Sequence, residues 1–101
     1  MSMAMIWFLV LEKGGVIYEV LDYAENYKRI LDCFRKWVSF AKGNAQIDIN
    51  VMAPDYCKCT INGASCCVRL LPKFPGSYFG IKVGTKEAAA ILGCEERLIC
   101  Q

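Results

Sequence analysis

The chemically most versatile side chains in this sequence are seven cysteines, and the sequence contains no histidine. Histidine is the side chain whose ordinary pKa lies near neutrality, so Cys–His and Ser–His–Asp catalytic arrangements cannot be built from this chain. Zinc sites that require histidine are excluded for the same reason. Catalysis would need a perturbed carboxylate, lysine, tyrosine or thiolate. We therefore favour a non-enzymatic role with no catalytic residue, no cofactor and no metal.

Four of the cysteines flank Asn62-Gly63, a dipeptide typical of the two-residue turn of a β-hairpin. With this turn, strands over 56–61 and 64–71 pair so that Cys59 faces Cys66 and Lys58 faces Cys67. Because side chains alternate along a strand, Cys57, Cys59 and Cys66 share one face with apolar residues. Lys58, Cys67 and Arg69 lie on the other face.

Three interpretations fit the apolar cysteines. They can be core residues, since a buried free cysteine behaves as a small hydrophobe. Cys59 and Cys66 can form a cross-strand disulfide, or the thiolates can hold a metal with a fourth cysteine. The spacing is not that of zinc knuckles, which favours the core interpretation. Since an odd number of cysteines cannot all pair within one chain, we expect free thiols and an intracellular, cytoplasmic protein.

Cys67 differs from these three because it lies on the polar face, beside Lys58 and Arg69. Nearby cations lower the pKa of a thiol and favour the nucleophilic thiolate. The register therefore makes Cys67 the candidate reactive thiol.

Basic residues are concentrated in residues 56–86, which contain five lysines and arginines and no acid. A predicted helix earlier in the chain adds a second basic face. Cations on a sheet, with aromatic residues among them, suit a phosphate backbone. The candidate anion-binding or nucleic-acid-binding residues are Lys58, Arg69, Lys73, Lys82, Lys28 and Arg35.

The N-terminal part predicts a second hairpin, with apolar runs over 5–11 and 16–21 around Gly14-Gly15. This register places Leu11 opposite Tyr18 and leaves both faces apolar, with Val20 on the face of Leu9 and Leu21 on the face of Phe8. Because one helix can cover only one face, we expect a homodimer. Its predicted interface residues are Trp7, Phe8, Leu9 and Tyr18. The first apolar run is too short to span a membrane, so we expect no membrane association.

The remaining patterns complete an α+β fold in a single domain, residues 1–101. Asp22 and Glu25 have the spacing of a capping box and predict a helix over about 23–42, ended by Gly43. Strands are predicted over 46–52 and 78–83, and a short C-terminal helix over about 85–92, between Thr85 and Gly93. The sheet should be mostly antiparallel, with five or six strands.

These patterns favour a small non-catalytic binding or regulatory module, homodimeric and acting through protein–protein contacts with a partner that the sequence does not identify. A nucleic-acid-binding protein that uses the basic 56–86 surface and the basic helix face is the first alternative. A thiol-dependent metal or redox protein is the second.

Overall fold

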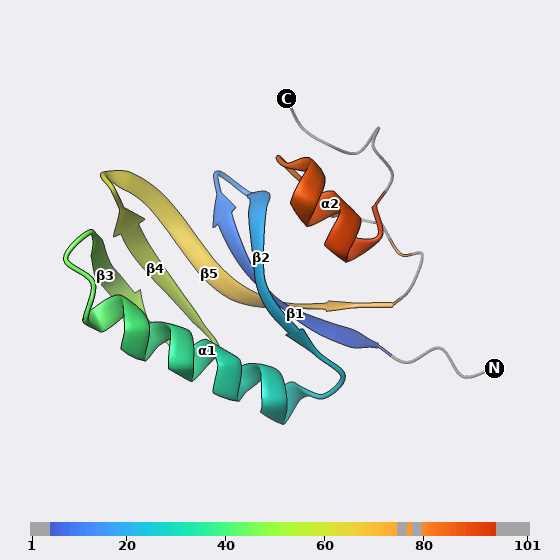
Figure 1. Ribbon diagram of the computed structural model, residues 1–101, viewed down its shortest axis with the longest axis horizontal. Helices are drawn as coiled ribbons and strands as arrows, with labels where there is room; N and C mark the ends of the chain where they lie inside the picture. Colours follow the sequence, from blue (N-terminus) through green and yellow to red (C-terminus); the bar gives the residue numbers. More distant parts are fainter. Residues whose placement is uncertain (1–4, 75–76, 78–79, 95–101) are drawn as a thin grey trace.

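The protein folds as a five-stranded antiparallel sheet with one long and one short helix, the α+β class that the sequence predicts. The computed structural model describes residues 5–74, 77 and 80–94. The strand order is β2-β1-β5-β4-β3 (Figure 1). The elements in chain order are β1 (Ile6–Lys13), β2 (Val16–Ala24), α1 (Tyr27–Lys42), β3 (Ile47–Met52), β4 (Tyr56–Ile61), β5 (Ala64–Lys73) and α2 (Lys86–Leu92).

The β4–β5 hairpin has the predicted register. Asn62 and Gly63 both have positive φ, 49° and 82°, as the tight turn between twisted strands requires. Cys59 lies opposite Cys66, and Lys58 lies opposite Cys67. The turn residues alone therefore set which side chains share each face of these two strands.

The β1–β2 hairpin turns at Gly14-Gly15 as predicted, but its register shifts farther from the turn. Leu11 lies opposite Glu19, not Tyr18, because the ladder is irregular between Leu11 and Glu12 and again between Leu9 and Val10. One extra residue moves the side chains that follow it to the other face, and the second extra residue restores the original alternation. The prediction was therefore wrong for two residues of β2. Val20 packs with the cluster of Phe8, and Leu21 packs with the cluster of Leu9.

Both faces of this hairpin are covered by the chain itself (Figure 1). On one face, Leu9 packs with Ile30 and Phe34 of α1. On the other face, Phe8 and Ile17 pack with Ala89 and other residues of the α2 region. Two small cores therefore lie on opposite sides of one sheet, and α2 supplies the second cover that one helix could not.

Helix α1 begins four residues later than predicted, at Tyr27. Its N-cap is Asn26, whose side-chain Oδ1 accepts a 2.9 Å hydrogen bond from the Arg29 backbone N–H. Asp22, the predicted capping residue, lies in β2 opposite Leu9. Residues 22–24, which the capping pattern assigns to the start of a helix, are thus part of β2 and pair with β1. The end of the helix at Gly43 is confirmed.

The predicted strand over 78–83 is not part of the sheet where the structure describes it. Residues 78–79 lie outside the described residues, and Val83 forms only an isolated parallel bridge to Ile17. The Ile17 N–H donates to the Lys82 carbonyl, and the Gly84 N–H donates to the Ile17 carbonyl, both at 2.8 Å. Helix α2 then begins after Thr85 and ends at Gly93, as predicted. No described helix has the length and apolar character needed to cross a membrane.

Candidate functional site

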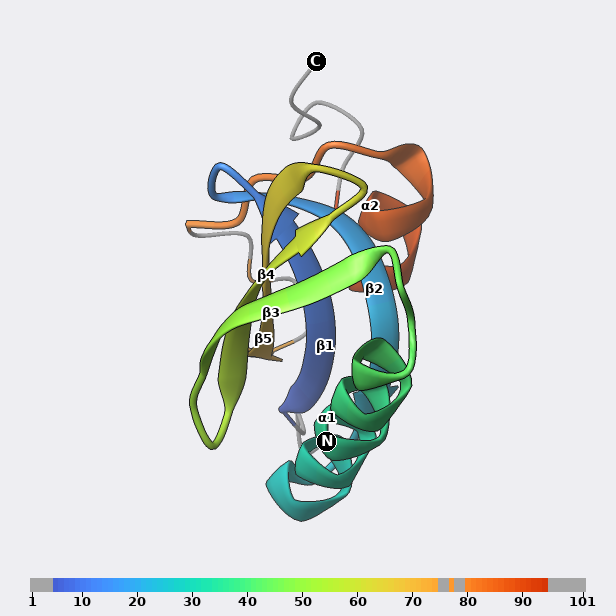
Figure 2. The ribbon, with the colours of Figure 1, turned by 90° about the vertical axis from the view of Figure 1, so that its left-hand side faces the viewer.

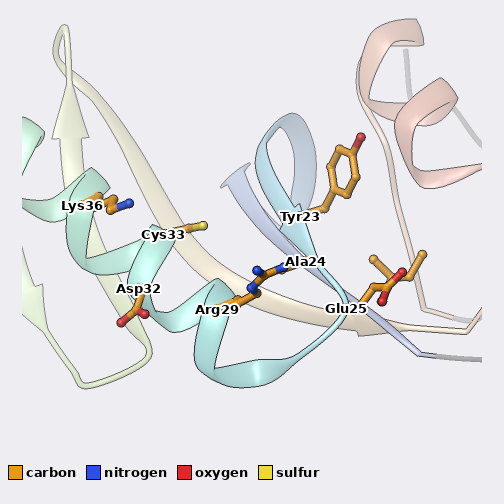
Figure 3. A pocket seen from close by; sticks show the side chains of 8 residues that line it. Tyr23, Ala24, Glu25, Arg29, Asp32, Cys33 and Lys36 are labelled. Atoms are coloured by element: carbon orange, nitrogen blue, oxygen red, sulfur yellow. The ribbon is translucent and has the colours of Figure 1, made fainter.

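The grooves beside α1 are the candidate binding sites of this protein. Helix α1 packs across β1, β2, β3 and β5 and therefore borders both edge strands of the sheet. A cavity of about 670 Å³ lies between the first turns of the helix and the end of β2 (Figure 3). We call it the α1–β2 groove. Its lining consists of Ile6, Tyr23, Ala24, Glu25, Arg29, Asp32, Cys33 and Lys36.

The α1–β2 groove is charged but carries no net charge. Figure 3 shows the side chains of Arg29, Cys33 and Lys36 directed from α1 toward β2. Spacings of four and three residues place these three side chains on one face of the helix. The two cations are matched by the two acids of the lining, Glu25 and Asp32. The groove therefore complements a partner surface that carries both positive and negative side chains, rather than a small anion.

Cys33 is the nucleophilic group of this groove, and its surroundings keep it protonated. Burial raises the pKa of the Cys33 thiol, and the thiol's hydrogen bond to Asp22 and the charge of that carboxylate raise it further. The positive charge of Lys36 opposes this shift only in part. A thiol is a weak nucleophile compared with its thiolate. The arrangement therefore favours binding over covalent chemistry.

A second cavity, of about 320 Å³, lies between α1 and the end of β3, and we call it the α1–β3 groove. Phe34, Val38 and Met52 supply apolar surface, and Arg35 and Lys42 supply two positive charges. Ser39, Ala53 and Pro54 complete the lining, which contains no acid. This groove is thus apolar and basic, in contrast to the first.

The three cysteines of the apolar hairpin face are core residues. Cys57, Cys59 and Cys66 are buried and pack in the cluster that contains Phe34 and Val68. They form no disulfide in the structure. Burial raises the pKa of Cys57 to about 12, since a thiolate would lose its hydration among apolar side chains. These side chains fill the core beneath α1. Cys100 lies outside the described residues.

Cys67 is not the activated thiol that the sequence predicts. It lies on the polar face near Lys58 and Arg69, as expected, but also directly opposite Glu12 of β1. Burial and the negative charge of Glu12 raise the pKa of Cys67, and the two cations lower it by less. The prediction failed because the pairing of β5 with β1, which brings in Glu12, is not visible in the hairpin sequence.

The six candidate anion-binding residues do not form one surface. Arg69 pairs with Glu12 through its Nε, whereas Arg35 lies on α1 and makes only an exposed contact with Asp32, 3.6 Å between Nη1 and Oδ1. Lys73 is buried. Lys58, Lys82 and Lys28 are exposed, but on separate elements. Lys58 lies on β4 and Lys28 lies on α1. Lys82 adjoins β2, which β1 and β5 separate from β4 in the sheet.

Two of the four predicted dimer-interface residues are covered by their own chain. Phe8 is 5% exposed and Leu9 is 1% exposed, on opposite faces of β1. The Trp7 ring meets the Tyr27 ring edge to face, with centroids 5.0 Å apart. Tyr18 is 41% exposed, and the Lys13 ammonium lies 5.5 Å from its ring centroid. Phe8 and Leu9, two residues of the predicted dimer interface, therefore lie in the interior of the folded chain.

Sequence patterns gave no indication of the two grooves. On the predicted helix, the sequence pointed only to Lys28 and Arg35, whereas Arg29, Lys36 and Lys42 also line the grooves. No sequence pattern indicates that α1 packs across the sheet from one edge strand to the other. Within the described residues, no three Cys, Asp or Glu side chains are grouped so that they could hold a metal ion. Comparison with protein-family models, with curated proteins and with solved structures finds no match to this chain.

Proposed function

We propose that this protein is a non-catalytic binding module that acts through protein–protein contacts made by α1 and the adjoining sheet edges. The observation that carries the proposal is the pair of surface grooves along the helix, one at each edge strand. Grooves beside a helix and an edge strand are common sites for partner segments. The raised pKa of Cys33 and of Cys67 supports a binding role over thiol chemistry.

Lys36 offers a direct test, since it is exposed and its side chain extends from α1 toward the α1–β2 groove (Figure 3). A photo-crosslinking phenylalanine derivative at this position places the reactive ring at the groove. Irradiation in the native host should give discrete protein adducts. The added substitution Arg29→Glu should weaken them, because Arg29 lines the same groove.

The matched control is the same derivative at Tyr56. This exposed residue lies on β4 opposite Arg69, on the sheet face that carries Lys58. Equal protein adducts at both positions would indicate non-specific contact and would contradict the proposal. Nucleic-acid adducts confined to the Tyr56 position would favour the nucleic-acid alternative instead. In that case the protein should bind nucleic acid with a salt-dependent affinity. The logarithm of the association constant should fall by ~0.9 per unit of log salt concentration for each phosphate contacted.

A further inference from the structure

We infer that the α1–β3 groove binds an extended peptide segment that carries acidic side chains and adds to the edge of β3. The inference rests on the proposed function and specifies the partner's chemistry. It concerns the basic groove defined above, not the α1–β2 groove. Its three supports are the open strand edge, the apolar surface beside that edge and the charge of the groove.

One edge of β3 is open to an added strand. Among the described residues, β3 pairs only with β4, so its other side presents backbone groups without a neighbouring strand. Figure 2 looks onto this edge, with β3 in front of the other strands and α1 beside it. Val51 and Met52, at the end of β3, are 44% and 46% exposed. Extended peptides bind such edges through main-chain hydrogen bonds, and pockets beside the edge select their side chains.

The groove provides such a pocket. Phe34 and Val38 project from α1 into the core, and Met52 faces the same side of the sheet because it pairs with Cys57. Side chains alternate in an added strand, so every second residue would face this apolar surface and its two cations. A cavity of about 320 Å³ accommodates one apolar side chain with polar neighbours.

The positive charge of the α1–β3 groove determines which peptide side chains it favours. Arg35 and Lys42 are the charged residues of the lining, and both are positive. The ion pair of Arg35 with Asp32 involves side chains that are more than half exposed, so it neutralises Arg35 only weakly. Acidic side chains on either side of an apolar one would therefore complement the groove.

A second copy of this chain paired through its own β3 complements the groove poorly. The acid of β3, Asp48, pairs with Thr60 and faces away from α1, whereas Ile47 and Ile49 face the helix. A symmetric β3–β3 pairing would thus place no acid at Arg35 or Lys42, and would bring two basic helix faces together. The irregularity between Ile49 and Val51 also interrupts a regular ladder between two copies.

The experiment is a selection of random peptides displayed on phage, with the folded full-length protein as bait. The enriched peptides should carry Asp or Glu at alternate positions around an apolar residue. The variant with Arg35→Glu and Lys42→Glu should bind a representative selected peptide at least about tenfold more weakly. The control variant, with Lys28→Glu and Lys82→Glu, changes the net charge equally outside the groove and should bind like the wild type.

Backbone amide NMR shifts locate the peptide. Binding should perturb Val51, Met52 and the α1 residues of the groove. The inference is overturned if no peptide is enriched, if the enriched peptides lack acids, or if both variants bind them equally. It is also overturned if the shifts map elsewhere, or if the Arg35/Lys42 variant alters self-association. Crosslinks at Lys36 that persist after any of these outcomes would show that the proposed function holds without this peptide site.

Discussion

Cys57 and Cys67 belong to adjacent strands of one hairpin but lie on opposite faces of the sheet. Cys57 is enclosed among apolar side chains beneath α1, whereas Cys67 lies between Glu12 of β1 and Lys58 of β4. Burial raises the pKa of both thiols, in Cys67 with the help of the Glu12 charge. The environment of each thiol, rather than its place in the sequence, therefore determines its reactivity.

The buried thiols should be protected in the folded protein. Cys57, Cys59 and Cys66 should react with an alkylating reagent much more slowly than Cys33, Cys67 and Cys94, which are partly exposed. Most of the seven cysteines should react once the protein is denatured without reductant. Mass spectrometry of digested samples, labelled before and after denaturation, measures both. Equal labelling of all cysteines in the native state would contradict the burial, and closed disulfides would contradict free thiols.

Cys57 also predicts how stability depends on pH. Its pKa rises from 9.0 to about 12 on folding, so above pH 9.0 the unfolded chain releases a proton that the folded protein keeps. The protonated Cys57 thiol thus makes its full contribution to stability below pH 9.0. This contribution is lost as the pH rises toward about 12. Urea unfolding should show decreasing stability above about pH 9. Cys57→Ala should make this decrease shallower, and an unchanged slope would contradict the shift.

Arg69 predicts an effect on stability that a free surface cation would not have. It pairs with Glu12, whose side chain is only 10% exposed, so Arg69→Ala leaves a largely buried carboxylate without its partner. The expected loss is about 1–3 kcal/mol, less than for a fully buried pair because Arg69 is partly exposed. Adding Glu12→Gln should recover part of it, since the buried charge is removed. Chemical denaturation measures each variant, and a loss below about 0.5 kcal/mol would contradict the pairing.

At the scale of elements, strand pairing and helix capping compete where β2 meets α1. The local signals at Asp22 and Glu25 favour a helix, but residues 22–24 pair with β1 instead. The capping hydrogen bond to the Arg29 N–H comes from Asn26. Cross-strand pairing with a central strand outweighs a capping interaction worth about 1 kcal/mol.

The two possible helix starts can be separated by substitution. Asn26→Ala should cost about 1 kcal/mol of stability, because it leaves a helix N–H without its side-chain acceptor. Asp22→Ala should cost less, since Asp22 does not cap the helix and is itself exposed, with side-chain hydrogen bonds, among the described residues, only to the Tyr23 N–H and the Cys33 thiol. Thermal or urea unfolding of the two variants makes the comparison. The reverse order of the two effects would place the helix start at Asp22.

At the scale of the whole molecule, the two helices decide which apolar surface remains free. Helix α1 covers one face of the β1–β2 hairpin and the α2 region covers the other. Phe8 and Leu9 are therefore buried without a second subunit. This arrangement removes the reason for which a dimer was predicted.

The burial of Phe8 and Leu9 within their own chain predicts a monomer, in contrast to the homodimer that the sequence predicts. Sedimentation equilibrium at micromolar concentration should give a mass near 11.3 kDa. A mass of twice this value would restore the homodimer, and its interface would then have to lie outside Phe8 and Leu9.

The sequence by itself determined the features that depend on short-range geometry. Asn62-Gly63 fixed the β4–β5 register, because a two-residue turn with positive φ leaves one way to pair the strands. Thr85 and Gly93 marked the ends of α2, and Gly43 marked the end of α1. The α+β class followed from the order of these elements.

Only the tertiary structure decided the features that depend on contacts distant in the sequence. The pairing of β5 with β1 placed Glu12 beside Cys67 and Arg69, which changed the chemistry assigned to both. The irregularities in β1–β2 exchanged the faces of Val20 and Leu21, because one extra residue reverses the alternation of a strand. The grooves at the two sheet edges exist because α1 packs across the sheet. The direction of a helix across a sheet is set by the packing of side chains from several strands, which no local pattern encodes.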